Sequence, residues 1–230
     1  RVLAGIYKPD EGVAYFDDEP VYENPSVKEQ ISFVADELYF LTGANMKKMA
    51  IMYKRLYDNF DMDRFNELTK IFGLDPDKNI ANFSKGMRRQ ASIILTLSTR
   101  AKYMFFDETF DGLDPVMRNL VKKLICDDVA EKGSTVIITS HSLRELEDIC
   151  DHLALLHKGG LVLDSDVLEM KTTQFKVQVA FEEKFNESKF WDMNITRYRQ
   201  EGSVANMIVN GDREEMIKRF RDMNPIILDI

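Results

Sequence analysis

Two adjacent carboxylates are the first feature of this 230-residue chain that could do chemistry. Asp107 and Glu108 directly follow residues 103–106, a short apolar run that is typical of a strand buried on both faces. Neighbouring side chains on a strand point to different faces, so the two acids can take different tasks. Asp107 could hold Mg²⁺, because a hard cation prefers oxygen ligands, and Glu108 could orient an attacking water. Taken alone, the motif is explained at least as well by two solvated acids that end a strand.

A histidine and a small polar turn add to this pair. His141 follows the apolar residues 135–139, and an imidazole at the end of a strand can hydrogen-bond to a transferred phosphate. Ser84, Lys85 and Gly86 precede a long helical pattern. Backbone N–H groups at a helix start bind anions, and glycine permits close approach. Each feature has an ordinary alternative, namely a helix-capping histidine and an N-cap serine before a basic helix face.

The elements that must position these residues alternate between strand and helix. Residues 31–34, 103–106 and 135–139 are predicted strands, the last two buried, and residues 116–131 and 143–150 are predicted helices. Such alternation indicates a parallel α/β sheet. Ligands of open α/β sheets bind at the carboxyl ends of the strands, which is where the acidic pair and the histidine stand.

Two further regions flank this core in the sequence. Residues 38–97 have a helical, methionine-rich pattern and are predicted to form a helical subdomain. Flexible methionines suit a surface that packs against a partner, although they could equally fill the core of their own helices. Residues 153–163 are predicted to form a hairpin that closes the sheet edge. Residues 171–230 follow a β-α-β-β-α-β order, which predicts a small ferredoxin-like α+β appendage with an interaction or regulatory role.

Composition narrows the class of protein. The chain is 44% hydrophobic and 30% charged, as expected of a globular protein. Its net charge of −8 argues against a nucleic-acid groove or an anionic membrane surface as the main partner. The two cysteines are expected to be reduced, which indicates a cytosolic compartment. No apolar run reaches the roughly 20 residues that span a bilayer.

In this order the motifs resemble those of the ATP-binding subunit of ABC transporters. Residues 83–87 resemble the signature loop of that family, residues 103–108 its Walker B strand with the catalytic glutamate, residues 111–114 its D-loop and residues 140–141 its switch histidine. The resemblance implies a P-loop NTPase-like (RecA-like) parallel sheet core over residues 1–170, with the inserted α-helical subdomain. The appendage is similar to that of the drug- and antibiotic-export branch.

The resemblance also implies a mechanism. Two subunits, identical or different, would pair head to tail around two ATP molecules, and ATP hydrolysis would drive export through transmembrane permease subunits. Such a subunit is cytoplasmic and lies at the inner face of the cell membrane through its permease, without binding nucleic acid. The implied site residues are the catalytic Glu108 and His141, the Mg²⁺ ligand Asp107, the nucleotide-binding Asp36 and Asp114, and Ser84, Lys85 and Gly86, which would contact the ATP of the partner subunit.

The chain departs from the family pattern at several positions. Asp36 stands where the Q-loop of the family has glutamine, and Lys85 and Met87 stand where glycine and glutamine are usual. No G-x-x-x-x-G-K-[ST] loop is present, and residues 1–5 resemble the helix that follows this loop. We therefore expect the phosphate loop to lie upstream of residue 1 and the chain alone not to bind ATP in its own main site. Two alternatives stay open: a degenerate or truncated subunit that only dimerises without hydrolysing ATP, and a soluble ABC protein not involved in transport.

Overall fold

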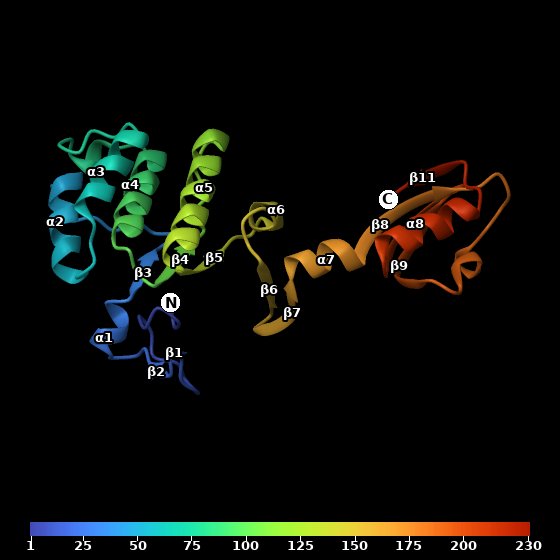
Figure 1. Cartoon of the computed structure of the whole chain (residues 1–230), viewed down its shortest axis with the longest axis horizontal. Coiled ribbons are helices and arrows are strands. Elements are labelled where there is room, and N and C mark those ends of the chain that lie inside the picture. Colours follow the sequence, from blue (N-terminus) through green and yellow to red (C-terminus); the bar gives the residue numbers. More distant parts are fainter. The chain divides into compact units, whose positions relative to one another are not determined.

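The computed structural model describes residues 1–230, which form two compact units, Arg1–Ile149 and Cys150–Ile230 (Figure 1). All the candidate site residues lie in the first unit. Residues 150–170, which the sequence analysis assigns to the ATPase domain, pack within the second unit. Their assignment to the ATPase domain by function stays a prediction.

A three-stranded parallel sheet forms the centre of the first unit. Its strands are β3 (Ile31–Val34), β4 (Tyr103–Asp107) and β5 (Thr135–Thr139), in the order β3-β4-β5. Phe106 of β4 lies beside Val34 of β3, and Asp107 lies beside Thr139 of β5. Because all three strands run in the same direction, their carboxyl ends meet at one edge. The predicted fold class, α/β with a parallel sheet, is confirmed.

The middle strand β4 is covered on both faces, as its apolar sequence predicts. Met104 and Phe106 belong to the main core beneath the helices. Tyr103 and Phe105 point to the other face and pack in a smaller cluster with Val21 and neighbouring residues. That cluster contains residues of the segment formed by β1 (Tyr15–Phe16), β2 (Glu19–Pro20) and α1 (Pro25–Lys28).

The expectation that β5 is equally buried is wrong. Ile137 of β5 is 36% exposed, while Val136 and Ile138 pack against the main core. The reason is that only one face of β5 is covered by helices. Position at the end of the sheet does not account for it, because β3 at the other end is buried. An apolar run alone does not show which faces of a strand are covered.

The helices of the first unit have well-formed starts. Side chains of Asn45, Asp61, Ser84 and Asp114 accept hydrogen bonds from backbone N–H groups in the first turn of the helix that each precedes. Such caps satisfy donors that have no partner within the helix. α2, α3 and α4 lie together in Figure 1, and α5 follows β4. The helices are α2 (Met46–Leu56), α3 (Met62–Ile71), the 3-10 helix Ile80–Asn82, α4 (Lys85–Ser98), α5 (Pro115–Lys132) and α6 (Leu143–Leu146).

Two details of the helical prediction change. The predicted helix over residues 143–150 ends at Leu146, so α6 is a single turn. In α2, Met46 and Met49 are fully buried in the main core, whereas Ile51 and Leu56 face solvent. The alternative in which methionines fill the core of their own helices is therefore right for these two. The exposed side of α2 combines Ile51 and Leu56 with four basic side chains, Lys47, Lys48, Lys54 and Arg55.

A buried ion network joins the helical region to α5. The Asp128 side chain is 2% exposed and accepts hydrogen bonds from Arg64 Nη2 at 3.2 Å and Arg100 Nη1 at 2.9 Å. Arg100 Nε also contacts Asp61 Oδ2 at 3.3 Å. Arg64 lies at the start of α3, Arg100 follows the end of α4, and Asp128 lies in the last turns of α5. The network fixes the ends of three helices relative to one another.

The second unit is mainly antiparallel. Its β6–β7 hairpin forms a two-stranded sheet of its own, and its closing of the parallel sheet edge stays a prediction. A four-stranded sheet in the order β11-β8-β10-β9 follows, and α8 contributes Met216 and Phe220 to its core. The β-α-β-β-α-β order is present, but its first helix is one turn of 3-10 helix. The elements are β6 (His152–His157), β7 (Gly160–Asp166), α7 (Val167–Thr173), β8 (Gln174–Ala180), the 3-10 helix Glu187–Phe190, β9 (Asn194–Glu201), β10 (Val204–Asn210), α8 (Arg213–Asp222) and β11 (Ile227–Asp229).

Neither unit contains a helix with both the length and the apolar character that crossing a membrane requires.

Candidate functional site

Glu108 and His141 meet at the carboxyl edge of the parallel sheet. His141 Nδ1 lies 2.9 Å from Glu108 Oε2. The backbone of Glu108 has φ +47°, a left-handed conformation that a non-glycine residue adopts at a cost. Its N–H donates to the Thr139 carbonyl oxygen at 3.1 Å, which holds this turn against the end of β5. The strand end is therefore bent in a way that places the glutamate next to the histidine.

Asp107 has a different partner from that of Glu108. Thr139 Oγ1 donates to Asp107 Oδ1 at 2.5 Å. This hydrogen bond joins β4 to β5 at the last paired position and leaves the second carboxylate oxygen of Asp107 available to a ligand. The two adjacent carboxylates thus stand in different surroundings, as their separate predicted tasks require. The tasks themselves stay predictions.

The electrostatics of the pair favour a charged histidine. The hydrogen bond to Glu108, followed by the attraction of its negative charge, raises the pKa of His141 above 6.5. The His141 side chain is exposed, while that of Glu108 is partly buried. A protonated imidazole at this edge is a donor that a phosphate oxygen could accept.

The loop that carries His141 is held by residues that the sequence analysis missed. Ser140 Oγ donates to Glu145 Oε2 at 2.8 Å, and Glu145 Oε1 accepts from Arg118 Nη1 at 2.9 Å. Ser140 Oγ also accepts from the Ser142 N–H at 3.0 Å. α5 therefore supports the histidine loop through Arg118. The sequence marks these three residues only by their places. Thr139 ends β5, Arg118 lies in the helix after β4, and Glu145 lies in the helix after β5.

The turn at Ser84–Gly86 packs against the loop at residues 111–114. Ser84 Oγ accepts from the Met87 N–H at 3.2 Å and caps α4. A Cβ on Gly86 would lie 3.1 Å from the Gly112 carbonyl oxygen, so a larger side chain would push the two loops slightly apart. Lys85 Nζ contacts Asp111 Oδ2 at 2.9 Å, and this contact lowers the pKa of Asp111. The predicted signature turn and the predicted D-loop thus form one surface.

Asp114 and Asp36 have structural partners within the chain. Asp114 Oδ1 accepts from the N–H groups of Val116 and Met117, at 3.0 Å each, and so caps α5. Asp36 follows β3 and forms an ion pair with Arg89 Nη2 at 3.1 Å. The structure places Asp36 at the end of a strand adjacent to β4, as expected. Whether either aspartate binds nucleotide stays a prediction.

The donor set at the sheet edge suits Mg²⁺ brought by a nucleotide. No group of three or more His, Cys, Asp or Glu side chains could hold a metal ion. Mg²⁺ in phosphate-transferring sites usually takes one or two carboxylates together with phosphate oxygens and water. Asp107, with one carboxylate oxygen already held by Thr139, fits this role. When bound, the ion would neutralise charge on the phosphates.

Comparisons with known proteins agree with this geometry. A family model described as "AAA domain, putative AbiEii toxin, Type IV TA system" matches residues 14–147. The ABC transporter ATP-binding protein YtrB of Bacillus subtilis (strain 168) is 28% identical over 225 residues, which cover 98% of this chain and 77% of that protein. The daunorubicin/doxorubicin resistance ATP-binding protein DrrA of Streptomyces peucetius is 28% identical over 179 residues, which cover 75% of this chain but only 54% of that protein.

A solved structure shows the same fold. The structure of an ATP binding subunit of an ABC transporter superposes with a TM-score of 0.67 at 19% identity, over 74% of this chain and 72% of that chain. Together with the relatives, it confirms the predicted resemblance to ATP-binding subunits of ABC transporters. The roles of the individual site residues are not decided by these likenesses.

Proposed function

Because the chain belongs to the AAA domain family, whose model covers residues 14–147, we propose that it is the ATP-binding subunit of an ABC transporter, which hydrolyses ATP to drive export. Its similarity to ATP-binding proteins of ABC transporters supports this function. The observation that carries it is the contact of 2.9 Å between Glu108 and His141 at the end of the parallel strands. In this proposal residues 1–170 are the ATPase domain.

Each residue of the sheet edge has a defined task. Glu108 orients the attacking water, whose oxygen bonds to the γ-phosphorus while the bond to the leaving oxygen breaks, giving ADP and phosphate. His141, held by Glu108, donates a hydrogen bond to a γ-phosphate oxygen. Asp107 supports Mg²⁺, and Asp36 and Asp114 flank the nucleotide. The hydrogen bonds of Glu108, Asp107 and Asp114 within the chain keep these groups in place before ATP binds.

The turn at Ser84–Gly86 serves a different ATP molecule. In a head-to-tail dimer it meets the nucleotide bound by the partner subunit, with Ser84, Lys85 and Gly86 against the phosphates. Its supporting observation is the packing of Gly86 on Gly112 and of Lys85 on Asp111. This packing ties the turn to the loop that starts at Glu108, since the Asp111 N–H donates to the Glu108 carbonyl oxygen at 3.2 Å.

Permease subunits in the membrane are the partners through which the ATPase acts, which places the protein at the inner face of the cell membrane. Large apolar side chains that are exposed in the helical region support this contact. Tyr39, Leu41, Ile51 and Leu56 are all exposed there. Exposed apolar side chains of this size suit a protein–protein contact. The similarity to a drug-resistance ATP-binding protein favours export of a drug or antibiotic.

Steady-state ATP hydrolysis by the full-length protein with its permease tests this function. The Glu108→Gln variant should lose at least about 100-fold in turnover, because general-base catalysis contributes on the order of 10²–10⁴. Glu29→Gln is the matched control, since Glu29 is an exposed glutamate at the end of α1. Equal turnover in both variants would show that Glu108 is not the catalytic carboxylate. No hydrolysis by the unsubstituted protein would refute the ATPase itself.

A further inference from the structure

The buried guanidinium of Arg89 has no task in the mechanism above. Arg89 lies on α4 and is only 1% exposed. Its Nη1 donates to the Ala35 carbonyl oxygen at 2.9 Å and its Nη2 to Asp36 Oδ1 at 3.1 Å. Its Nε is buried without a hydrogen-bond partner. A buried charge is costly unless it is paired, so the position of Arg89 depends on Asp36.

The two members of this ion pair differ sharply in exposure. The Arg89 side chain is 2% exposed, whereas that of Asp36 is 54% exposed. The arginine therefore reaches the strand end from inside the protein and grips it at two points, one on the backbone and one on the carboxylate. The second carboxylate oxygen of Asp36 is left for solvent or a ligand. Such a two-point contact fixes both the position and the orientation of Asp36.

The charge of Arg89 matters because of its neighbours. Asp36, Asp107 and Glu108 follow adjacent parallel strands, so three carboxylates stand at one edge of the sheet. An anionic polyphosphate is repelled by each uncompensated negative charge. Because the Arg89 guanidinium neutralises the charge of Asp36, an acidic side chain is tolerated beside an anionic nucleotide.

The same helix carries the turn that the proposed function places against the partner's ATP. α4 begins at Lys85 with Ser84 as its cap, and Arg89 follows five positions after Ser84. At a rise of 1.5 Å per residue, the two lie about 7.5 Å apart along the helix axis. A displacement of Asp36 that pulls on Arg89 is therefore passed to the start of α4 by a rigid element.

We propose that Arg89 is a positioning residue of the ATPase, which neutralises and orients Asp36 toward the Mg²⁺-bound nucleotide of its own subunit and links it to the Ser84–Gly86 turn. The inference rests on the proposed function. Arg89 acts only through Asp36 and does not itself touch the nucleotide. It follows that removing Asp36 and removing Arg89 have unequal effects on stability, that the double variant regains the stability lost in Asp36→Asn, and that it impairs ATP use no more than Asp36→Asn alone.

Thermal unfolding without nucleotide gives the first readout. Asp36→Asn leaves the buried guanidinium without its carboxylate, so the unfolding temperature should fall by at least about 5 °C. Arg89→Met replaces the charge by an apolar chain and leaves a hydratable aspartate, so the fall should be less than about 2 °C. The double variant should regain the stability that Asp36→Asn loses. If Asp36→Asn does not fold, a folded double variant shows that removing Arg89 restores stability. Equal losses in the two single variants would overturn the asymmetric pair.

The ATP concentration that gives half-maximal hydrolysis, at saturating Mg²⁺, is the second readout. Arg89→Met should raise it about tenfold, because a charged hydrogen bond that orients Asp36 is lost. In the double variant it should rise no further than in Asp36→Asn alone, because Arg89 acts only through Asp36. A double variant with a larger defect than either single variant would overturn the proposal, since Arg89 would then act independently of Asp36.

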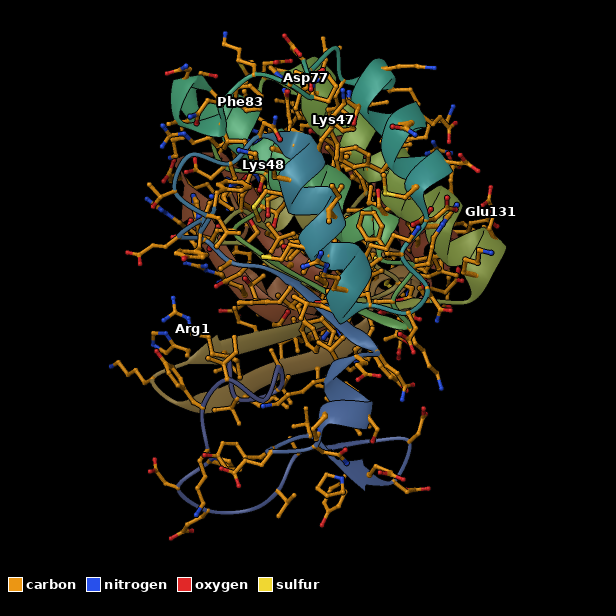
Figure 2. The ribbon with its side chains drawn as sticks, turned by 90° about the vertical axis from the view of Figure 1, so that its left-hand side faces the viewer. Arg1, Lys47, Lys48, Asp77, Phe83 and Glu131 are labelled. Carbon is orange, nitrogen blue, oxygen red and sulfur yellow. The ribbon has the colours of Figure 1, made fainter.

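The ion pair between Lys47 and Asp77 supplies the matched control. Its distance is 2.6 Å, but both side chains are more than half exposed (Figure 2). Lys47→Met and Asp77→Asn should leave both readouts unchanged. A full-length protein that hydrolyses no ATP would refute the proposed function, while the unfolding temperatures would still decide whether Arg89 depends on Asp36.

Discussion

The buried carboxylate of Asp128 supports the sharpest stability prediction. Asp128→Asn keeps the shape of the side chain and removes the charge that two arginines share. Arg64 and Arg100 have side chains only 12% and 16% exposed, so water cannot fully replace the lost partner. Breaking a buried ion pair costs about 3–5 kcal/mol. Each arginine keeps one other acid, since Arg64 contacts Glu67 at 3.0 Å and Arg100 contacts Asp61 at 3.3 Å.

These remaining contacts place the expected loss at the lower end of that range, about 3 kcal/mol. For a domain of this size it corresponds to a fall of about 6–12 °C in the unfolding temperature. Circular dichroism during thermal unfolding is the suitable assay, because the first unit holds most of the helix. The single tryptophan, Trp191, lies in the second unit and reports on the wrong transition.

The exposed aspartate of the Lys47–Asp77 pair is the control for this prediction. Exposed ion pairs contribute about 0.2–1 kcal/mol, so Asp77→Asn should shift the midpoint far less than Asp128→Asn. Two equal midpoints would refute the reasoning that burial makes the Asp128 network indispensable.

Two further outcomes follow from the site geometry. The Glu108 contact stabilises protonated His141, so its contribution to stability is complete below the unfolded pKa of 6.5 and is lost as the pH rises through the higher folded pKa. In Glu108→Gln the pKa of His141, measured by NMR titration, should move back toward 6.5. An unchanged pKa would contradict the contact. Gly86→Ala gains about 0.5–1 kcal/mol of helix propensity, but its Cβ would lie 3.1 Å from the Gly112 carbonyl oxygen. We therefore expect ATP turnover to fall while the thermal midpoint stays nearly constant. Unchanged turnover would show that the two loops need not pack this closely.

Local sequence patterns were sufficient to predict the elements of the site. The apolar run before Asp107, and the histidine after the next strand, gave the correct strands because burial and strand ends leave a short-range signal. The same patterns offered a capping role for Ser84 as the ordinary alternative to anion binding, and the structure shows this cap, since capping depends on residues within one turn.

Contacts between distant segments could not be predicted in this way. Arg89 is separated from Asp36 by 53 positions and Asp128 from Arg64 by 64 positions, and neither pair leaves a periodic pattern. The exposure of Ile137 depends on which face of β5 other elements cover, and the sequence of a single strand does not encode that. The left-handed backbone of Glu108 was unforeseen because only tertiary contacts, such as the hydrogen bond to Thr139, hold a glutamate in that conformation.

The central claim is that each ATP is hydrolysed between Glu108 of one subunit and the Ser84–Gly86 turn of the other. Mixing the full-length Glu108→Gln and Ser84→Ala variants, each nearly inactive alone, tests it most directly. In a homodimer, random pairing makes about half of the dimers mixed, and each mixed dimer holds one intact site of two. The account predicts that roughly a quarter of the unsubstituted activity returns on mixing. Activity that stays at the level of the separate variants would contradict it.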